Sequence, residues 1–225
     1  MSAVLFGSIG SVVETSEVQR AAFNEAFQKH GLEWHWTRDE YQALLVHSGG
    51  RHRIDAYAKA RSEKVDAAAI HRTKSEIFQQ TIREGSLQPR PGVAEVIRDA
   101  KDCGLKVGLV TTTSRGNIEA LLGSVARAVD AQHFDLIVDV TQADEPKPSP
   151  RCYQFAMRQL GETAETCIAI EDNVDGVASA KAAGLTCVAF PGNNTAAHDY
   201  SDSDVCTEQL SYGLLDQHLA AKTTV

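Results

Sequence analysis

The chain has 225 residues, of which 43% are hydrophobic and 23% charged, and its formal net charge is −8. This composition is typical of a folded globular protein, and no apolar run approaches the ~20 residues needed to cross a bilayer. The acidic charge provides no field that would attract nucleic acid, and the first residues lack the basic and apolar regions of a secretory signal. We therefore predict a soluble, cytoplasmic protein, a monomer or weak dimer, with no nucleic-acid or membrane partner.

The cysteines and histidines form no recognisable metal or redox motif. The five cysteines are scattered and odd in number, and the eight histidines include no HExxH or similar metal-ligand spacing. We expect reduced thiols, and histidines with surface or packing roles.

The first predicted elements are a strand and a helical insert. An apolar run at 3–6 ends in a glycine-rich turn and predicts a buried strand. From 16 to 83 apolar residues recur at helical spacing, so we expect helices without strands. The segment 85–92, GSLQPRPG, contains two prolines and two glycines and marks a domain junction.

After this junction, helical and strand-like segments alternate. Helices are predicted at 93–102, 150–160 and 174–183, and strands at 105–110, 136–140, 167–170 and 186–190. Such alternation predicts right-handed crossovers and a parallel sheet covered by helices on both faces. The predicted fold class is α/β, a Rossmann-like doubly wound core formed by 1–15 and 86–225, with a small all-α cap formed by 16–85.

A doubly wound sheet gathers its ligand-binding residues at the carboxyl ends of its strands. Four polar segments follow predicted strands there: 6–11, 111–114, 146–150 and 171–173. Together they offer hydroxyls, a cation, adjacent carboxylates and glycine-rich backbone amides. These groups are the components of a site for phosphate and a divalent metal.

Each of these segments also has a simpler interpretation. Lys147, between two prolines, is either a phosphate-binding cation on a stiff backbone or a solvated lysine in a turn. Glu171 and Asp172 are either Mg²⁺ ligands or residues at a helix N-terminus, where carboxylates contribute roughly 0.3–1 kcal/mol. Thr111 is either a ligand-binding hydroxyl or the cap of the next helix.

The order of the segments resembles the haloacid dehalogenase superfamily. It is most similar to members with a helical cap between the first and second motifs, such as β-phosphoglucomutase and the phosphoglycolate and sugar-bisphosphate phosphatases. The resemblance is carried by AVLFGSIGSVVET, LQPRPGVAEVIRDAKDCGLKVGLVTTTS, EPKPSPRCYQFAM and CIAIEDNVDGVASAKAAGLTCVAFP.

This resemblance implies roles for individual residues. Thr111 would bind phosphate, Lys147 would neutralise phosphoryl and carboxylate charge, and Asp172 with Glu171 would form the metal site. The segment SGGRHRI is similar to the family's substrate loop, in which basic groups contact a remote phosphate or sugar; otherwise it is a turn with exposed arginines. The implied phosphate- and substrate-binding residues are Ser8, Thr111, Thr112, Lys147, Arg51 and Arg53.

The chain departs from the family in the first motif. The family has a nucleophilic, metal-binding aspartate and, two residues later, an acid–base aspartate; the corresponding residues are Gly7 and Ile9. Strand alternation predicts that both face the same side, with Ile9 in the space of the leaving group and Ser8 facing away. The remaining metal ligands would be Asp172 and a carbonyl near Ile9, so we expect Mg²⁺ to bind weakly or not at all.

Three hypotheses about function follow. The first is an impaired or inactive phosphatase homologue that still binds a small phosphorylated metabolite, since lost negative charge near Lys147 favours an anion. The second is an active phosphosugar hydrolase with a rearranged acidic site; its candidates, which are otherwise surface acids, are Glu14, Asp144, Glu145 and Asp175. The third is a protein-binding scaffold. Whether the chain is an enzyme stays open at this point.

Overall fold

The computed structural model describes residues 2–143 and 145–220, with side chains as far as residue 218. Within these residues, a parallel sheet has the strand order β3-β2-β1-β4-β5-β6. The predicted doubly wound α/β fold is confirmed. The strands are β1 (Ala3–Phe6), β2 (Lys106–Val110), β3 (Leu136–Val138), β4 (Cys167–Glu171), β5 (Thr186–Ala189) and β6 (Val205–Cys206).

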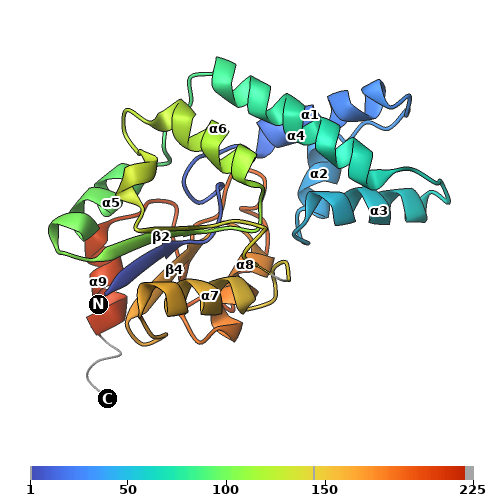
Figure 1. Cartoon of the computed structure of the whole chain (residues 1–225). Coiled ribbons are helices and arrows are strands. Elements are labelled where there is room, and N and C mark those ends of the chain that lie inside the picture. Colours follow the sequence, from blue (N-terminus) through green and yellow to red (C-terminus); the bar gives the residue numbers. More distant parts are fainter. Residues whose placement is uncertain (1, 144, 221–225) are drawn as a thin grey trace.

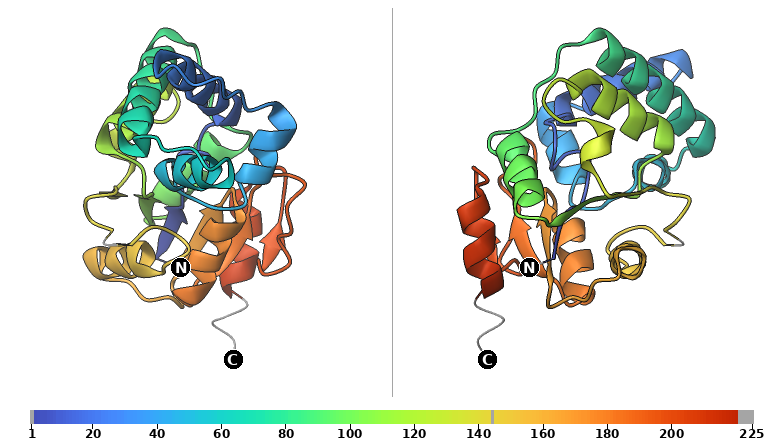
Figure 2. Two further views of the ribbon diagram at one scale, coloured as in Figure 1. Left: turned by 90° about the vertical axis from the view of Figure 1, so that its right-hand side faces the viewer. Right: turned by 60° about the vertical axis from the view of Figure 1, so that its left-hand side comes forward.

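Helices cover both faces of the sheet (Figure 1). One face carries α5 (Val93–Asp102), α6 (Arg115–Val125) and α9 (Tyr212–Ala220), whereas the other carries α7 (Arg151–Leu160) and α8 (Val174–Ala182). The two further views show the same layers from the sides (Figure 2). None of the described helices is long and apolar enough to span a membrane. The cytoplasmic location and the oligomeric state stay predictions.

Alternate side chains of β1 point to opposite faces of the sheet. Val4 and Phe6 belong to the apolar cluster that includes α5, whereas Ala3 and Leu5 belong to the cluster that includes α7 and α8. Successive side chains of a strand point to opposite faces, so both faces of β1 are packed. An apolar run without polar alternation is therefore what this central parallel strand requires.

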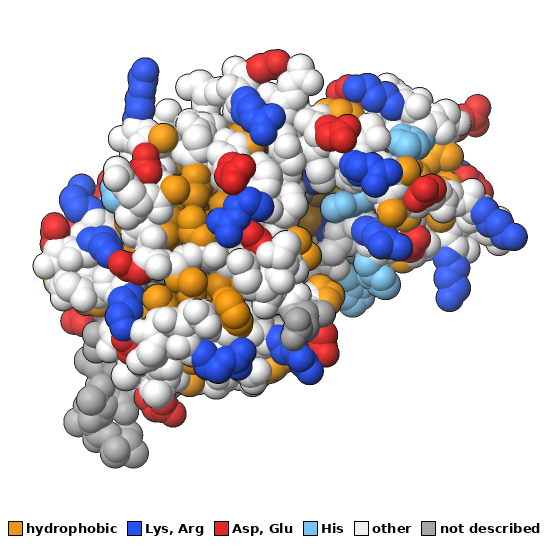
Figure 3. Space-filling model, viewed as in Figure 1, with side chains coloured by type: hydrophobic (Ala, Val, Ile, Leu, Met, Phe, Trp, Pro, Cys, Tyr) orange, Lys and Arg blue, Asp and Glu red, His pale blue; other side chains and the backbone are white. Residues whose placement is uncertain are grey.

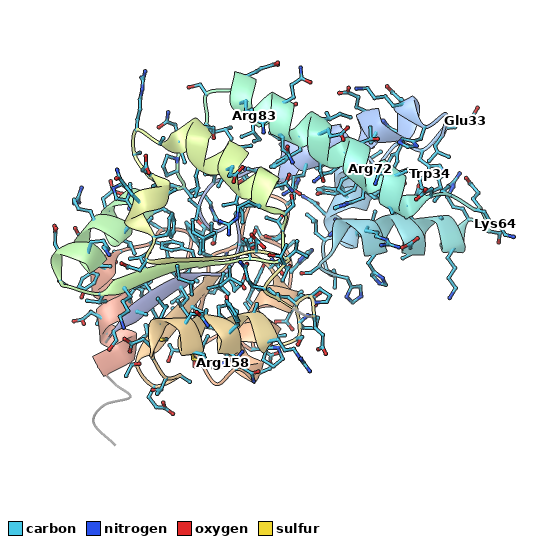
Figure 4. The ribbon with its side chains drawn as sticks, viewed as in Figure 1. Glu33, Trp34, Lys64, Arg72, Arg83 and Arg158 are labelled. Carbon is cyan, nitrogen blue, oxygen red and sulfur yellow. The ribbon has the colours of Figure 1, made fainter. Side chains whose placement is uncertain are left out.

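The helical insert lies beside the sheet, at its carboxyl edge (Figure 1). We call residues 16–85 the cap; its boundaries as a domain stay a prediction. In the cap α1 and α3 pack on α4, and its interior is aromatic, with the rings of Phe23 and Phe27 centred 4.9 and 4.7 Å from that of Trp36. Glu33, Trp34 and Lys64 lie at the end remote from the sheet (Figure 4). The cap helices are α1 (Ser16–Lys29), α2 (Arg38–Leu44), α3 (Gly50–Ala60) and α4 (Ala67–Glu84).

Most predicted elements agree with the structure to within two residues, but four in the described residues were missed. These are α6, α9, the two-residue β6 and a short 3-10 helix at Ala131–His133. A further difference bears on the site: β4 includes Glu171, which we had expected to follow the strand. As a strand residue, Glu171 has a side-chain direction fixed by the alternation of β4.

Candidate functional site

A cavity of about 800 Å³ lies between the cap and the carboxyl ends of the strands. Ser8, Thr111 and Asp172 line it from the core, and Arg53 and Lys74 line it from the cap. The space-filling view shows the recess at this junction, with Lys, Arg and His side chains gathered on its cap side (Figure 3). The position is the one expected for a ligand site in a doubly wound sheet.

The turn after β1 does not follow the predicted alternation. Ser8 Oγ donates to Asp172 Oδ1 at 2.8 Å and accepts from the Ser11 N–H at 3.0 Å. The prediction that Ser8 faces away from the site is therefore wrong. The reason is that the chain leaves the strand at Phe6 and turns, so strand parity no longer sets side-chain directions.

Ile9 lines the cavity as predicted, but it does not share a side with Gly7. Ile9 is buried in the apolar cluster of Val4 and Phe6. A Cβ built on Gly7 would instead point to Tyr153, which belongs to the cluster on the other face. The expectation of one shared side is wrong, again because the strand has ended before residue 7.

The side chain that Gly7 lacks would have no room. A Cβ at this position would lie 2.1 Å from Glu171 Oε1 and 2.3 Å from the Tyr153 hydroxyl. Glu171 is fully buried, and its parity in β4 places it on the same face as Cys167, toward α7. The carboxylate of Glu171 thus occupies the volume in which the family's nucleophile would begin.

Lys147 is buried beneath the cavity and does not line it. Its ammonium donates to Glu171 Oε1 at 2.5 Å, to the Val110 carbonyl at 3.0 Å and to the Gly7 carbonyl. These bonds use all three of its donors. Burial alone would lower the pKa of Lys147, but the charge of Glu171 outweighs it and raises the pKa above its ordinary value. The solvated-lysine interpretation is wrong, and phosphate binding by Lys147 stays a prediction.

Tyr153 completes this buried group. Its hydroxyl donates to Glu171 Oε1 at 2.7 Å, and its ring lies 4.7 Å from the Lys147 ammonium. We call Gly7, Lys147, Tyr153 and Glu171 the Glu171 cluster.

Asp172 is the carboxylate of the acidic pair that faces the cavity. Its Oδ1 accepts hydrogen bonds from Ser8 Oγ and from Asn173 Nδ2, both at 2.8 Å. Glu171 points away into the Glu171 cluster and does not line the cavity. The two acids therefore lie adjacent in sequence without presenting both carboxylates to one ion.

The donor groups do not fit a Mg²⁺ ion held by the protein. The Ile9 carbonyl lies where a carbonyl ligand was expected, but it accepts from the N–H groups of Val12 and Val13 at 3.2 and 2.9 Å. Among the residues that the structure describes, no group of three His, Cys, Asp or Glu side chains could hold a metal. Mg²⁺ is usually held by one or two carboxylates, with waters and ligand phosphates completing its octahedral set. The acids that line the cavity are Asp172 and Glu14, and both already accept hydrogen bonds from the protein.

The hydroxyl-rich loop after β2 faces the cavity. Thr111, Thr112 and Thr113 all line it, and Thr111 Oγ1 accepts from the Thr113 N–H at 3.2 Å. Ser114, not Thr111, caps α6 by accepting from the Asn117 N–H. The helix-cap interpretation of Thr111 is wrong, and its hydroxyl stays available to a ligand as a proposal.

The two cap arginines lie on α3 and differ in exposure, although both line the cavity. Arg51 is exposed, and its Nε lies 3.9 Å from an oxygen of Asp55. Arg53 is only 8% exposed, and it donates to the carbonyls of Leu44 and His47, both at 2.8 Å. The alternative interpretation, a turn with exposed arginines, is wrong for the backbone, because both residues are helical; the expected exposure holds for Arg51 and is wrong for Arg53.

Lys74 is a cavity residue that the sequence analysis missed. Its side chain is 3% exposed, and its ammonium donates to Gln19 Oε1 at 3.0 Å. Burial first, and then the charge of Arg53, lowers the pKa of Lys74 to about 7. Its position between Ile70 and Ile77 places a lysine in the buried stripe of α4, and this was the signal that could have revealed it.

The cap wall of the cavity is therefore electropositive. Burial, followed by the charges of Lys74 and Arg53, lowers the pKa of His71 to about 4. Neither Arg53 nor Lys74 forms an ion pair with any acid in the described ranges. We call Arg53 and Lys74 the cap cations; they are buried and have no ion-pair partner among the described residues, although the charge of Asp175 acts on Arg53 from farther away.

Glu14 is the one candidate replacement acid that the structure places on the cavity. One of its oxygens accepts from the N–H and Oγ of Ser16 at 2.9 and 2.5 Å, and the other accepts from the Asn193 N–H at 2.7 Å. Both oxygens thus anchor the start of α1 and a neighbouring core loop.

The other candidate acids do not line the cavity. Glu145 is exposed and lies 3.3 Å from Arg151, and Asp175 accepts from the Ser48 N–H at 2.6 Å. Asp144 lies outside the described residues. The structure therefore offers no support for a rearranged acidic site among the described candidates.

Comparison with known proteins agrees with this architecture. Protein CbbY of Cereibacter sphaeroides is 38% identical over 209 residues, which cover 91% of this chain and 90% of that protein. The crystal structure of CbbY from Rhodobacter sphaeroides in complex with phosphate is 36% identical, with a TM-score of 0.87, and covers 98% of this chain and 99% of that one. A CbbY structure from the same organism in complex with xylulose-1,5-bisphosphate is 37% identical, with a TM-score of 0.85 and coverages of 93% and 94%.

Two findings show the family: the 38% identity to CbbY of Cereibacter sphaeroides over 209 residues, and a match to a family model. Residues 1–184 match the model of haloacid dehalogenase-like hydrolases. Because this match spans most of the chain and includes the cap, the chain belongs to the haloacid dehalogenase-like hydrolase family.

Proposed function

We propose that the chain binds a small phosphorylated sugar in the cavity between cap and core, with little or no turnover. The observation that carries this proposal is the pair of buried cap cations without an acidic partner among the described residues. A buried charge is costly unless it is paired, so an anionic ligand would supply the missing partner. Hydroxyls of Ser8, Thr111 and Thr112 line the opposite wall.

The relatives support the choice of ligand. CbbY structures contain phosphate in one case and xylulose-1,5-bisphosphate in the other. A sugar phosphate has a negatively charged group that can pair with the cap cations. It also has hydroxyls that can form hydrogen bonds with Thr111, Thr112 and Thr113 in the loop after β2.

Little turnover is expected because the site lacks both a nucleophile and an acid–base group in the first motif. Gly7 has no side chain to attack phosphorus, and Ile9 carries no proton for a leaving group. Removing members of a catalytic unit costs on the order of 10⁴ to 10⁶ in turnover, or roughly 5–8 kcal/mol of barrier. Each described candidate acid is bonded elsewhere, so none compensates.

Binding is tested with xylulose-1,5-bisphosphate by thermal shift and calorimetry, on the wild type and on two α4 variants. Lys74→Met removes a cap cation but keeps apolar volume. Arg72→Met removes the same charge from the exposed side of α4 and is the matched control (Figure 4). We expect a higher melting temperature with ligand for the wild type and Arg72→Met, and at least tenfold weaker binding for Lys74→Met.

Turnover is tested by phosphate release from the same compound with Mg²⁺ present. We expect no release above the background of a protein-free control. Release at about 1 s⁻¹ or faster, within the usual range of enzymes, would overturn the second half of the proposal. Equal binding by wild type and Lys74→Met would overturn the first half.

A further inference from the structure

We propose that the Glu171 carboxylate is a built-in anion that fills the phosphoryl-transfer position of the core. In consequence the core side of the cavity holds neither a phosphate group nor Mg²⁺, and a ligand of this protein binds without a metal. The inference rests on the Glu171 cluster and on the donor atoms around Asp172. It does not depend on the proposed function, because its probes are Mn²⁺ and inorganic phosphate.

The Glu171 carboxylate fills the space at the end of β1. The Glu171 carboxylate lies where two side chains are missing: a Cβ at Gly7 would be 2.1 Å from Oε1, and a Cβ at Gly176 would be 2.1 Å from Oε2. Real Cβ atoms do not approach oxygen this closely. The carboxylate can occupy this position at the end of β1 only because residues 7 and 176 are both glycines without side chains.

The charges of Glu171 and Lys147 compensate each other inside the core. Lys147 gives one of its three donors to Glu171 and the other two to the carbonyls of Val110 and Gly7. Tyr153 donates its hydroxyl to the same carboxylate oxygen. The positive charge that would otherwise attract a phosphate to the core is thus compensated inside the protein, below the lining of the cavity.

The oxygen atoms that could bind a metal are mostly bonded within the protein. Glu171 accepts from Lys147 and Tyr153 through Oε1, and its Oε2, which has no hydrogen-bond partner among the described residues, lies against Gly176 and not on the cavity. The Ile9 carbonyl accepts from two backbone N–H groups, and Asp172 Oδ1 accepts from the Ser8 hydroxyl. The two carboxylates that line the cavity, Asp172 and Glu14, both already accept hydrogen bonds from the protein, which leaves little free donor capacity for a Mg²⁺ ion. In this arrangement a ligand phosphate is attracted by the cap cations.

Metal binding is measured directly by electron paramagnetic resonance with Mn²⁺ and the full chain. We expect no saturable site below millimolar Mn²⁺ in the wild type. In the double variant Gly7→Asp with Glu171→Ala, an aspartate replaces the carboxylate next to Asp172, and we expect at least tenfold tighter Mn²⁺ binding. Micromolar binding by the wild type that Asp172→Asn abolishes would overturn the inference.

The occupied anion position is tested by removing Glu171. All proteins in this arm carry Lys74→Met, so that phosphate binding at the cap is weakened and the remaining contribution of Arg53 is the same in every protein compared. Glu171→Ala frees Lys147 and opens the position, and we expect inorganic phosphate to raise the melting temperature of this variant. Glu171→Gln keeps the volume filled and is the matched control, for which no comparable rise is expected. Equal phosphate responses of the parent, alanine and glutamine proteins would contradict the proposal.

Gly7→Ala supplies a test that keeps Glu171, in case the alanine variant of Glu171 does not fold. The new Cβ must displace the carboxylate, so we expect the melting temperature to fall by several degrees. An unchanged melting temperature would show that the carboxylate does not fill this volume and would overturn the inference.

Discussion

The core beneath the cavity and the cap wall above it stabilise buried positive charge in different ways. On the core side, Lys147 is paired with Glu171 and bonded through all its donors. On the cap side, Arg53 and Lys74 are equally buried and have only neutral hydrogen-bond partners among the described residues. Since a buried charge without a nearby counter-ion is costly, the comparison supports our proposal that an incoming anion is attracted by the cap, not by the core.

The largest effect should come from breaking the core pair. Lys147→Met leaves the Glu171 carboxylate buried without its cation, and such losses cost about 3–5 kcal/mol of unfolding free energy. Lys74→Met removes a cation that has no acidic partner, so we expect it to be neutral or stabilising. Chemical denaturation of both variants measures the difference, and equal losses would erase the contrast between the two walls.

The next largest loss of stability should come from adding a side chain at Gly7, where no space is free. Gly7→Ala forces a Cβ against Glu171 and Tyr153, and overpacking of this kind costs typically about 1–3 kcal/mol. Gly123→Ala is the matched control: no atom lies within 4 Å of its added Cβ, and it lies in α6. There alanine should stabilise by up to about 1 kcal/mol through helix propensity. Denaturation midpoints that shift equally in the two variants would contradict this prediction.

A smaller effect is expected on the pH dependence of ligand binding, because Lys74 of the cap changes its protonation when an anion binds. The pKa of Lys74 is lowered to about 7 from 10.5, mainly by burial, so folding disfavours its proton. Its contribution to stability is therefore lowest below pH 7 and rises between pH 7 and 10.5. A bound phosphate would favour the charged form, so we expect uptake of about half a proton at neutral pH.

Calorimetry in buffers of different ionisation enthalpy measures this uptake. Lys74→Met, assayed at ligand concentrations that still saturate it, should lose the uptake, whereas Arg72→Met should retain it. Proton uptake that persists in Lys74→Met would assign it to the ligand itself.

The comparison also explains what the sequence could and could not predict. The sheet followed from apolar runs such as 3–6 and 167–170, because burial on both faces is a local signal. The position of Glu171 beside Gly7 depends on the register of β1 against β4, which juxtaposes residues far apart in sequence. Ser8 was placed on the wrong side because strand alternation was carried past the end of β1.

The cap wall was only partly predictable for a different reason. Arg53 was proposed from its segment, whereas Lys74 was overlooked because helical spacing was used to find apolar residues only. A lysine at a buried position of an amphipathic helix can be recognised from the helical spacing alone, without knowledge of the tertiary structure.

The smallest effect should come from the exposed member of the cap arginines. The side chain of Arg51 is 68% exposed and lies 3.9 Å from Asp55, so water and salt screen its charge. We expect Arg51→Ala to change the unfolding free energy by less than about 0.5 kcal/mol. Binding of xylulose-1,5-bisphosphate should weaken only a few-fold, and less at high ionic strength. Titrations at low and high salt measure this, and a loss as large as that of Lys74→Met would mean that exposed as well as buried cap charges hold the ligand.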